Sequence, residues 1–391
     1  MTPPAEAAAD EARLDAVVRV LAVAVLACLA CSWRLWLSTR RYPLVPLLGL
    51  VPPFPWPFDA VVLAAFAGLL VAVVLRPRSR GLLAAVGAGF ALLFAQDRSR
   101  MWPSFYEFFL LVLVLLSRRP AGGPDEPRRL LAGLQFVVAA VYFWGGVQKL
   151  TPEFFHGEFP WFVAPLAARV PAVEPWLPGL AVVAAVGEAL CGVGLLTRFR
   201  GLALGELLVM HAVIGVCIGP LRDGWNVAAW LWSLASAVLA WLLFRGPPGF
   251  RWSALFAAPL RNSLPQLAAV VLVGILPVLD NLNRWDSALS FNVYTGNVSR
   301  ARILLSPEAA TRLPAELAAH VSLENGRAVL DLDAWAMRQF NAGVYPARPV
   351  FAALLAVVCG EVADPSVRMV VVEKSGWGIP RSTLLHTCGE R

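Results

Sequence analysis

The stretch LLAGLQFVVAAVYFWGGVQKL, which runs from Leu130 to Leu150, decides the class of fold. It is almost wholly apolar over the roughly 20 residues that a helix needs to cross the hydrocarbon core of a bilayer. Similar blocks recur along the chain, in which 58% of the residues are hydrophobic and 15% are charged. A soluble domain has roughly 45–50% apolar and about 25% charged residues. The composition therefore excludes a soluble globular protein and predicts a multi-pass membrane protein.

Nine transmembrane helices are expected when about 17 to 25 apolar residues are counted as one span. The expected spans are residues 14–36, 58–75, 81–96, 103–117, 130–150, 179–197, 201–219, 225–244 and 265–282. The third and fourth are short for a full crossing, so they are expected to be tilted or to be joined by a loop that dips below the membrane surface. An interfacial or re-entrant segment, not one helix, is expected over residues 151–178 because prolines interrupt it. These prolines are Pro152, Pro160, Pro165, Pro171 and Pro175.

The net charge of +7 comes mostly from arginines in short loops between the apolar blocks. This is an orientation signal, since cytoplasmic loops are enriched in arginine and lysine, and nucleic-acid binding is not expected. The arginines expected to share the cytoplasmic face are Arg13, Arg19, Arg76, Arg78, Arg80, Arg118, Arg119, Arg128, Arg129, Arg198, Arg200, Arg245, Arg251 and Arg261. The N-terminus is then on the cytoplasmic side of the cell membrane and, after nine crossings, the C-terminal segment is on the extracytoplasmic side.

The C-terminal part of the chain has the composition of a small soluble domain. Residues 328–332 and 367–373 alternate in polarity like strands, and residues 334–340 and 350–358 have the apolar spacing of helices. The expected fold is an all-α polytopic membrane bundle over residues 1–284, followed by a small extracytoplasmic α+β domain over residues 285–391.

The cysteines leave two questions open. Cys359 and Cys388 both lie in the C-terminal part, where an oxidising compartment allows a disulfide, and two buried free thiols are the alternative. Cys28 and Cys31 form a CxxC pattern inside an apolar helix, where packing is favoured over a redox pair. A lipoprotein-type cleavage before Cys28 is discounted because the apolar run continues to Trp36, so the first block is expected to stay as an anchor.

Lys149 is the first candidate for chemistry. At 3.6 residues per turn it shares a helix face with Tyr142 and with Gly145 or Gly146, and glycines let a helix or a ligand ring approach the backbone. One interpretation is that the lysine extends its amine to the membrane interface. The other is that desolvation creates an amine able to act as a base near neutral pH. We expect Lys149 to face a cavity rather than lipid or bulk water, because two adjacent glycines open its helix face and aromatic residues follow it.

Glu188 and His211 lie in the middle of consecutive apolar helices, where an ionisable group costs about 2.5 to 3.5 kcal/mol and needs a partner or a function. Because the connecting turn is short, the helices are antiparallel neighbours and the two side chains are expected to be in direct or water-bridged contact. The pair would be either structural or part of a catalytic or proton-relay site. No metal site is expected.

Four stretches carry a resemblance to a known family. They are YFWGGVQKL (142–150) with the aromatics after it, QDRSRMWPSFYEF (96–108), GEALCGVGLL (187–196) with a histidine about 20 residues later, and RWDSALSFNVYTGN (284–297). Together, over roughly residues 80–300, they resemble the membrane domain of the vitamin K-dependent gamma-carboxylases, in the horizontally transferred transmembrane (HTTM) superfamily that also has DoxX-like relatives. The resemblance implies that Lys149 is the base that deprotonates a reduced vitamin K or menaquinol-type quinol.

The chain also departs from that family. The carboxylases have a histidine in the segment matching residues 97–106, and this chain has none there; Ser104 falls near it. Their large lumenal region is replaced by a much shorter C-terminal part, so carboxylation of a secreted protein is not implied.

The main hypothesis is an integral membrane enzyme, a carboxylase-like lyase or an oxidoreductase, that takes a quinol-type or other apolar substrate from the lipid bilayer. The residues expected to stack on the substrate or to orient it are Tyr142, Trp144, Trp102, Gln96, Asp97, Arg100, His156 and Asn226. A quinone-epoxide reductase or an extracytoplasmic protein is the expected partner. The alternatives are a non-catalytic membrane partner or assembly subunit, whose polar groups join helices, and a DoxX-like quinone-linked redox subunit.

Overall fold

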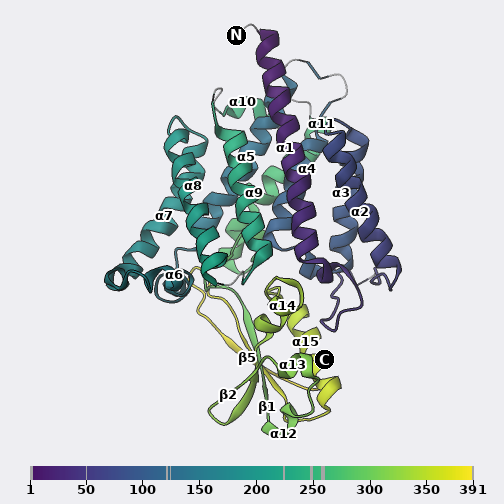
Figure 1. Cartoon of the computed structure of the whole chain (residues 1–391), viewed down its shortest axis with the longest axis vertical. Coiled ribbons are helices and arrows are strands. Elements are labelled where there is room, and N and C mark those ends of the chain that lie inside the picture. The colour runs from purple at the N-terminus through teal and green to yellow at the C-terminus, as the bar shows by residue number, and fades with distance from the viewer. Residues whose placement is uncertain are drawn as a thin grey trace.

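A computed structural model describes residues 3–49, 51–119, 122–123, 125–222, 225–246, 250–256 and 260–389. Most of the chain is helical, and the helices gather in a bundle at one end of the long axis (Figure 1). The strands lie together at the other end. The N-terminus lies at the end of the bundle that is farther from the strands (Figure 1).

Seven helical segments of the described chain are long and apolar enough to cross a membrane. They are α1 (Pro3–Cys31), α2 (Phe58–Leu75), α5 (Glu126–Gln148), α7 (Leu177–Leu195) with the 3-10 turn before it, α8 (Arg200–Ile218), α9 (Val227–Phe244), and α11 (Leu260–Gly274) with η6 (Leu276–Leu282). In the most apolar 18-residue stretch of α5, 83% of the residues are buried, whereas the corresponding share in α2 is 22%. The chain is therefore a membrane protein with α5 at its centre and other helices facing lipid.

Two shorter apolar helices, α3 (Arg80–Gln96) and α4 (Pro103–Leu116), stand where the third and fourth spans are expected. Their crossing of the membrane stays a prediction. The short elements that complete the described helical part are η1 (Trp33–Trp36), η2 (Arg98–Arg100), η5 (Pro220–Arg222), α10 (Trp252–Leu255) and η7 (Ala288–Ser290).

Helix α1 begins at Pro3, more than two turns before the expected start at residue 14. Its first turns carry acids that bind arginines of later loops, so they are helical although they are not apolar. Arg128 forms an ion pair with Asp10 at 2.9 Å, and Arg118 forms one with Glu11 at 2.5 Å. These ion pairs gather the arginine-rich loops around the N-terminal end of α1.

The proline-containing segment between α5 and α7 is broken, as predicted. A π-helical turn η3 (Phe154–Glu158) is followed by α6 (Phe159–Ala167) and by the 3-10 turn η4 (Pro171–Trp176). Figure 1 shows α6 at the end of the bundle nearer the strands.

An antiparallel sheet of order β2-β3-β1-β4-β5 forms the other end of the molecule. Its strands are β1 (Arg300–Leu305), β2 (Val321–Glu324), β3 (Arg327–Leu330), β4 (Arg368–Val372) and β5 (Thr383–Thr387). The helices with it are α12 (Pro307–Ala310), α13 (Ala315–Ala318), α14 (Leu332–Phe340) and α15 (Arg348–Val362). The two strands and two helices expected from the sequence correspond to β3, β4, α14 and α15.

Cys359 of α15 and Cys388 after β5 form a disulfide, which is the first of the two alternatives that the sequence leaves open. Cys28 and Cys31 are free thiols in the structure. Cys28 is buried against the bundle, as packing predicts.

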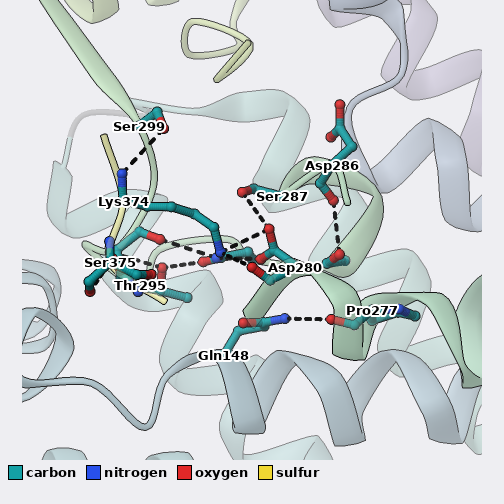
Figure 2. A network of polar contacts seen from close by, with 12 residues as sticks. Gln148, Pro277, Asp280, Asp286, Ser287, Thr295, Ser299, Lys374 and Ser375 are labelled. Carbon is teal, nitrogen blue, oxygen red and sulfur yellow. Dashed lines mark hydrogen bonds and ion pairs between the residues drawn. The ribbon is translucent and has the colours of Figure 1, made fainter. Parts of the chain in front are cut away.

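A buried ion pair joins the last helical turn of the bundle to the loop after β4 (Figure 2). Lys374 Nζ lies 2.9 Å from Asp280 Oδ1 and donates to the backbone oxygen of Asp280 at 2.6 Å. Ser287 and Asn292 donate to the same carboxylate at 2.9 and 3.0 Å. Gln148, at the end of α5, donates to the Pro277 carbonyl at 3.4 Å (Figure 2). The sheet end and the end of α5 therefore meet at η6.

We predict that Lys374→Met lowers the free energy of unfolding by about 3 to 5 kcal/mol, because it leaves a buried carboxylate without its cation. Thermal or denaturant unfolding in detergent measures this change. The matched control is Glu324→Ala, which breaks the exposed Arg302–Glu324 pair (side chains 66% and 49% exposed) and should cost less than about 1 kcal/mol. Equal losses in the two variants would contradict the anchoring role.

Candidate functional site

Helices α5 and α7 touch through their backbones at two glycines, Gly146 and Gly192. A Cβ atom on Gly146 would lie 2.6 Å from the Ala185 oxygen, and one on Gly192 would lie 2.5 Å from the Ala139 oxygen. Side chains cannot occupy these positions unless the helices move apart. The expectation that the glycines of the lysine motif admit a neighbouring helix is confirmed, since small residues are what such close contacts require.

Lys149 caps α5 and forms an ion pair with Glu188 of α7. Its Nζ lies 2.8 Å from Glu188 Oε2 and 3.0 Å from Oε1, and it donates to the Gly145 carbonyl at 3.2 Å. A Cβ on Gly145 would stand 2.6 Å from Glu188 Oε1, so this glycine makes room for the carboxylate. The side chains of the pair are 17% and 12% exposed. The amine therefore turns inward to a partner instead of extending to the membrane interface.

A direct or water-bridged contact between Glu188 and His211 is expected; the direct contact is wrong, and a contact through water stays a prediction. His211 Nε2 lies 2.7 Å from the Tyr142 hydroxyl, and its Nδ1 lies 2.8 Å from Ser233 Oγ. Both ring nitrogens are thus engaged, while Glu188 binds Lys149. The antiparallel arrangement of α7 and α8 sets the depth of each side chain, but the rotation of each helix decides which neighbour it faces. Lys149 of α5 is the stronger partner for a carboxylate because it carries a charge.

A cavity of about 660 Å³ inside the bundle brings these groups together. Lys149, Glu188, Tyr142 and His211 all line it. The expectation that Lys149 faces a cavity is confirmed. Apolar side chains make up most of the remaining wall, and they include Phe154, Phe159, Phe162, Leu180, Val183, Val209 and Met210. We call this the inner cavity.

Three further polar groups of the inner cavity were not singled out from the sequence. Glu107 of α4 is buried and accepts a hydrogen bond from Trp232 Nε1 at 2.6 Å, and Glu206 of α8 and Ser233 of α9 also line the cavity. The signal that picked out Glu188 applies equally to both glutamates, because each is an acid inside an apolar helix.

Gln96, Asp97 and Arg100 hold the loop before α2 and are absent from the lining of the inner cavity and of the outer cavity defined below. Gln96 Oε1 accepts from the Phe54 amide at 2.6 Å, and Asp97 pairs with Arg40. The Arg100 guanidinium donates to three backbone carbonyls at 3.0 to 3.3 Å. This corrects the expectation that the three orient a substrate: buried polar groups bind the nearest partners, here the loop itself.

Trp102, His156 and Asn226 line a second cavity, of about 760 Å³, between the bundle and the sheet. We call it the outer cavity. Asn226 Nδ2 donates to the Tyr294 hydroxyl at 2.9 Å, and Tyr294 belongs to the walls of both cavities. Trp144 lines neither: it is buried and packs edge-on against Phe143, with 5.0 Å between ring centroids. The structure therefore does not place Trp144 on the wall of the inner or the outer cavity, which corrects its expected place as a substrate wall.

Comparison of the chain with protein-family models, with curated proteins and with solved structures finds no match. The catalytic role of Lys149 and the family resemblance therefore stay predictions, and the function has to be inferred from the cavities.

We predict that Gly146→Ala lowers the free energy of unfolding by about 1 to 3 kcal/mol, the usual cost of overpacking. The new methyl group would meet the backbone of α7 at Ala185 and Ala189, which cannot yield as a side chain would. The control is Gly179→Ala on α7, where nothing lies within 4 Å of the added Cβ, and where the higher helix propensity of alanine should leave stability unchanged or raised. Unfolding in detergent compares the two, and an equally stable Gly146→Ala protein would refute the backbone contact.

Proposed function

We propose that the chain is an integral membrane enzyme in which Lys149 acts as a base on an apolar substrate that carries a hydroxyl group, of the quinol type. The observation that carries this proposal is the Lys149–Glu188 ion pair on the wall of an apolar cavity within the bundle. A charged pair in such a place costs free energy that tighter apolar packing would avoid, so a functional role is the reason to retain it.

The size and lining of the inner cavity support a quinol-type substrate. Its volume of about 660 Å³ lies in the range of roughly 300–1,000 Å³ that is usual for small-molecule sites, and a few polar groups interrupt an apolar wall as such sites require. Val183 of α7 and Val209 of α8 line the cavity and are 67% and 65% exposed, which places them toward lipid. An apolar substrate therefore has a route from the bilayer between these two helices.

In this proposal, Lys149 and Glu188 carry the proton transfer, and other polar residues of the inner cavity hold the substrate. Transfer of one proton from the Lys149 ammonium to Glu188, across the 2.8 Å contact, leaves a neutral amine that accepts the substrate's hydroxyl proton. The hydrogen-bonded series Tyr142, His211 and Ser233 stands on the same cavity and can hold a second polar atom of the substrate. A quinol supplies an acidic hydroxyl group and an electron-rich ring.

This proposal agrees with the resemblance to the vitamin K-dependent gamma-carboxylase and HTTM families, in which the lysine of the matching motif is the base. Reduced vitamin K or a menaquinol-type quinol is then the substrate or cofactor, with a lyase or oxidoreductase reaction. A quinone-epoxide reductase or an extracytoplasmic protein is the proposed partner.

The proposed topology has nine crossings of the cell membrane, with α3 and α4 as tilted short spans and the N-terminus inside. Supporting observations are the arginines of several loops gathered on the N-terminal end of α1, as positive-inside loops would be, and the sheet at the opposite end of the bundle (Figure 1). The Cys359–Cys388 disulfide supports an oxidising compartment for the sheet.

We predict that Lys149→Ala lowers kcat/KM for oxidation of reduced vitamin K or menaquinol, with dioxygen supplied as the oxidant, by about 10² to 10⁴-fold, the usual contribution of a general base. Lys149→Arg should fail as well, because a guanidinium can pair with Glu188 but cannot lose its proton. Turnover is followed by chromatography of the quinone products, with folding checked by thermal unfolding.

The control for this experiment is Arg302→Ala, an exposed side chain on β1 of the sheet, and this variant should turn over as the wild type does. Unchanged turnover in Lys149→Arg would remove the lysine from the reaction. A wild-type protein that turns over neither quinol and retains no quinone through purification would favour a non-catalytic membrane partner.

The proposed topology predicts that the C-terminus lies outside the cytoplasm. A reporter fused after Arg391 should therefore be active only if it is of a kind that functions there. An alkaline phosphatase fusion should be active and a green fluorescent protein fusion dark, and fusions after Arg78 should behave in the opposite way. A cytoplasmic C-terminus would mean that the number of crossings is even and would move the outer cavity to the cytoplasmic side.

A further inference from the structure

We propose that the outer cavity binds a ligand that carries an ammonium group, with Asp333 as its counter-ion and the Trp102 indole beside it. This site is separate from the inner cavity and does not depend on the role of Lys149.

The charges on the wall of the outer cavity leave one carboxylate without a cation. The charged residues that line it are Glu153, Glu158, Asp333, Arg300 and Arg381, together with His156. Arg300 pairs with Glu158 at 2.9 Å, and Arg381 pairs with Glu153 at 3.4 Å. Among the residues that the structure describes, no basic nitrogen lies within 4.0 Å of the Asp333 carboxylate, and Arg300, which pairs with Glu158, acts on it only from a longer distance. A cation brought by a ligand would complete the set.

Asp333 is held as an acceptor toward the cavity. It lies in the first turn of α14, where the helix dipole favours an anion, and its Oδ1 accepts the Val344 amide hydrogen at 2.9 Å. Its Oδ2 has no hydrogen bond within the described chain. Asp333 is exposed and lines the outer cavity, so its carboxylate is open to a ligand.

Gly343 brings the carboxylate and the Trp102 indole to one point. A Cβ atom on Gly343 would lie 3.1 Å from Asp333 Oδ1 and 3.7 Å from two ring carbons of Trp102. The glycine therefore leaves open the space between an anion and an aromatic ring, and both attract an ammonium group.

Aromatic rings are concentrated around the outer cavity. Trp102, Trp161, Trp225, Trp232 and Tyr294 all line it. One of these rings already holds a cation: the Arg222 guanidinium stands 4.2 Å from the centroid of the Trp161 ring. Indoles next to a carboxylate are the usual surroundings of choline-type and other ammonium groups. The ammonium could belong to a lipid headgroup or to a free amine.

Choline is the probe for this site, and its uncharged isostere 3,3-dimethylbutan-1-ol is the matched ligand control. Isothermal titration on the full chain in maltoside detergent, without phosphocholine lipids, measures both. The wild type should bind choline at least tenfold more tightly than the isostere.

Asp333→Asn keeps an oxygen to accept the Val344 amide hydrogen, and it should weaken choline binding at least tenfold without changing the affinity for the isostere. Gly343→Ala should weaken both ligands, because the methyl group fills the space between Asp333 and Trp102.

Asp331→Asn is the control variant, since Asp331 lies two residues away and caps α14 through the Ala334 amide at 2.9 Å, a role that asparagine fills equally well. It should bind choline as the wild type does.

Repeating the titration in nanodiscs with and without phosphatidylethanolamine identifies the source of the ammonium group: competition by the lipid indicates a headgroup, and no competition indicates a free amine. Equal affinity for choline and its isostere, or unchanged choline binding by Asp333→Asn, would overturn the proposal.

Discussion

The backbone contact between α5 and α7 is the constraint on which the inner cavity depends. Gly146 and Gly192 let the two helices approach until their backbones touch, and Gly145 leaves room for the Glu188 carboxylate. Only at that separation can Lys149, on the last turn of α5, reach the Glu188 carboxylate at 2.8 Å. In a bilayer an ammonium and a carboxylate must each find a partner, so the same contact that packs the helices also supplies the pairing that makes both charges tolerable.

The two lysines of the chain, Lys149 and Lys374, stand out among its 33 basic residues. Both form ion pairs with an acid that lies in or beside a membrane helix, whereas arginine serves the loops at the N-terminal end of α1. Lys374 is buried against Asp280 and lines neither cavity, while Lys149 lines the inner one. An ammonium can give up its proton and a guanidinium cannot, so the choice of lysine matters at a cavity. At Asp280 the compact ammonium instead joins the sheet to the bundle.

The two cavities lie against each other with different chemistry. The inner cavity has a wall that is mostly apolar, with its ionisable groups on α4, α5, α7 and α8, while the outer cavity carries carboxylates, arginines and indoles from both the bundle and the sheet. Ala229, Trp232, Val293 and Tyr294 belong to both walls. Residues 293 and 294 lie in the segment that connects η7 to β1, and the Asp280–Lys374 pair holds this junction in place (Figure 2). The sheet end therefore helps to shape the wall that separates the two spaces.

The sequence by itself determined the membrane class, the positions of the seven long apolar helices, the broken segment after α5 and the inward position of Lys149. These follow from local quantities: the length of an apolar run, the presence of proline, and the cost of a charge in lipid. Tertiary structure alone decided that Glu188 binds Lys149 while His211 binds Tyr142 and Ser233, and that Gln96, Asp97 and Arg100 hold a loop. It also placed Asp333 opposite Trp102, more than 200 residues away in the chain. Pairings of this kind depend on how each helix is rotated and how closely it approaches its neighbours, and a one-dimensional pattern of apolar residues contains neither quantity.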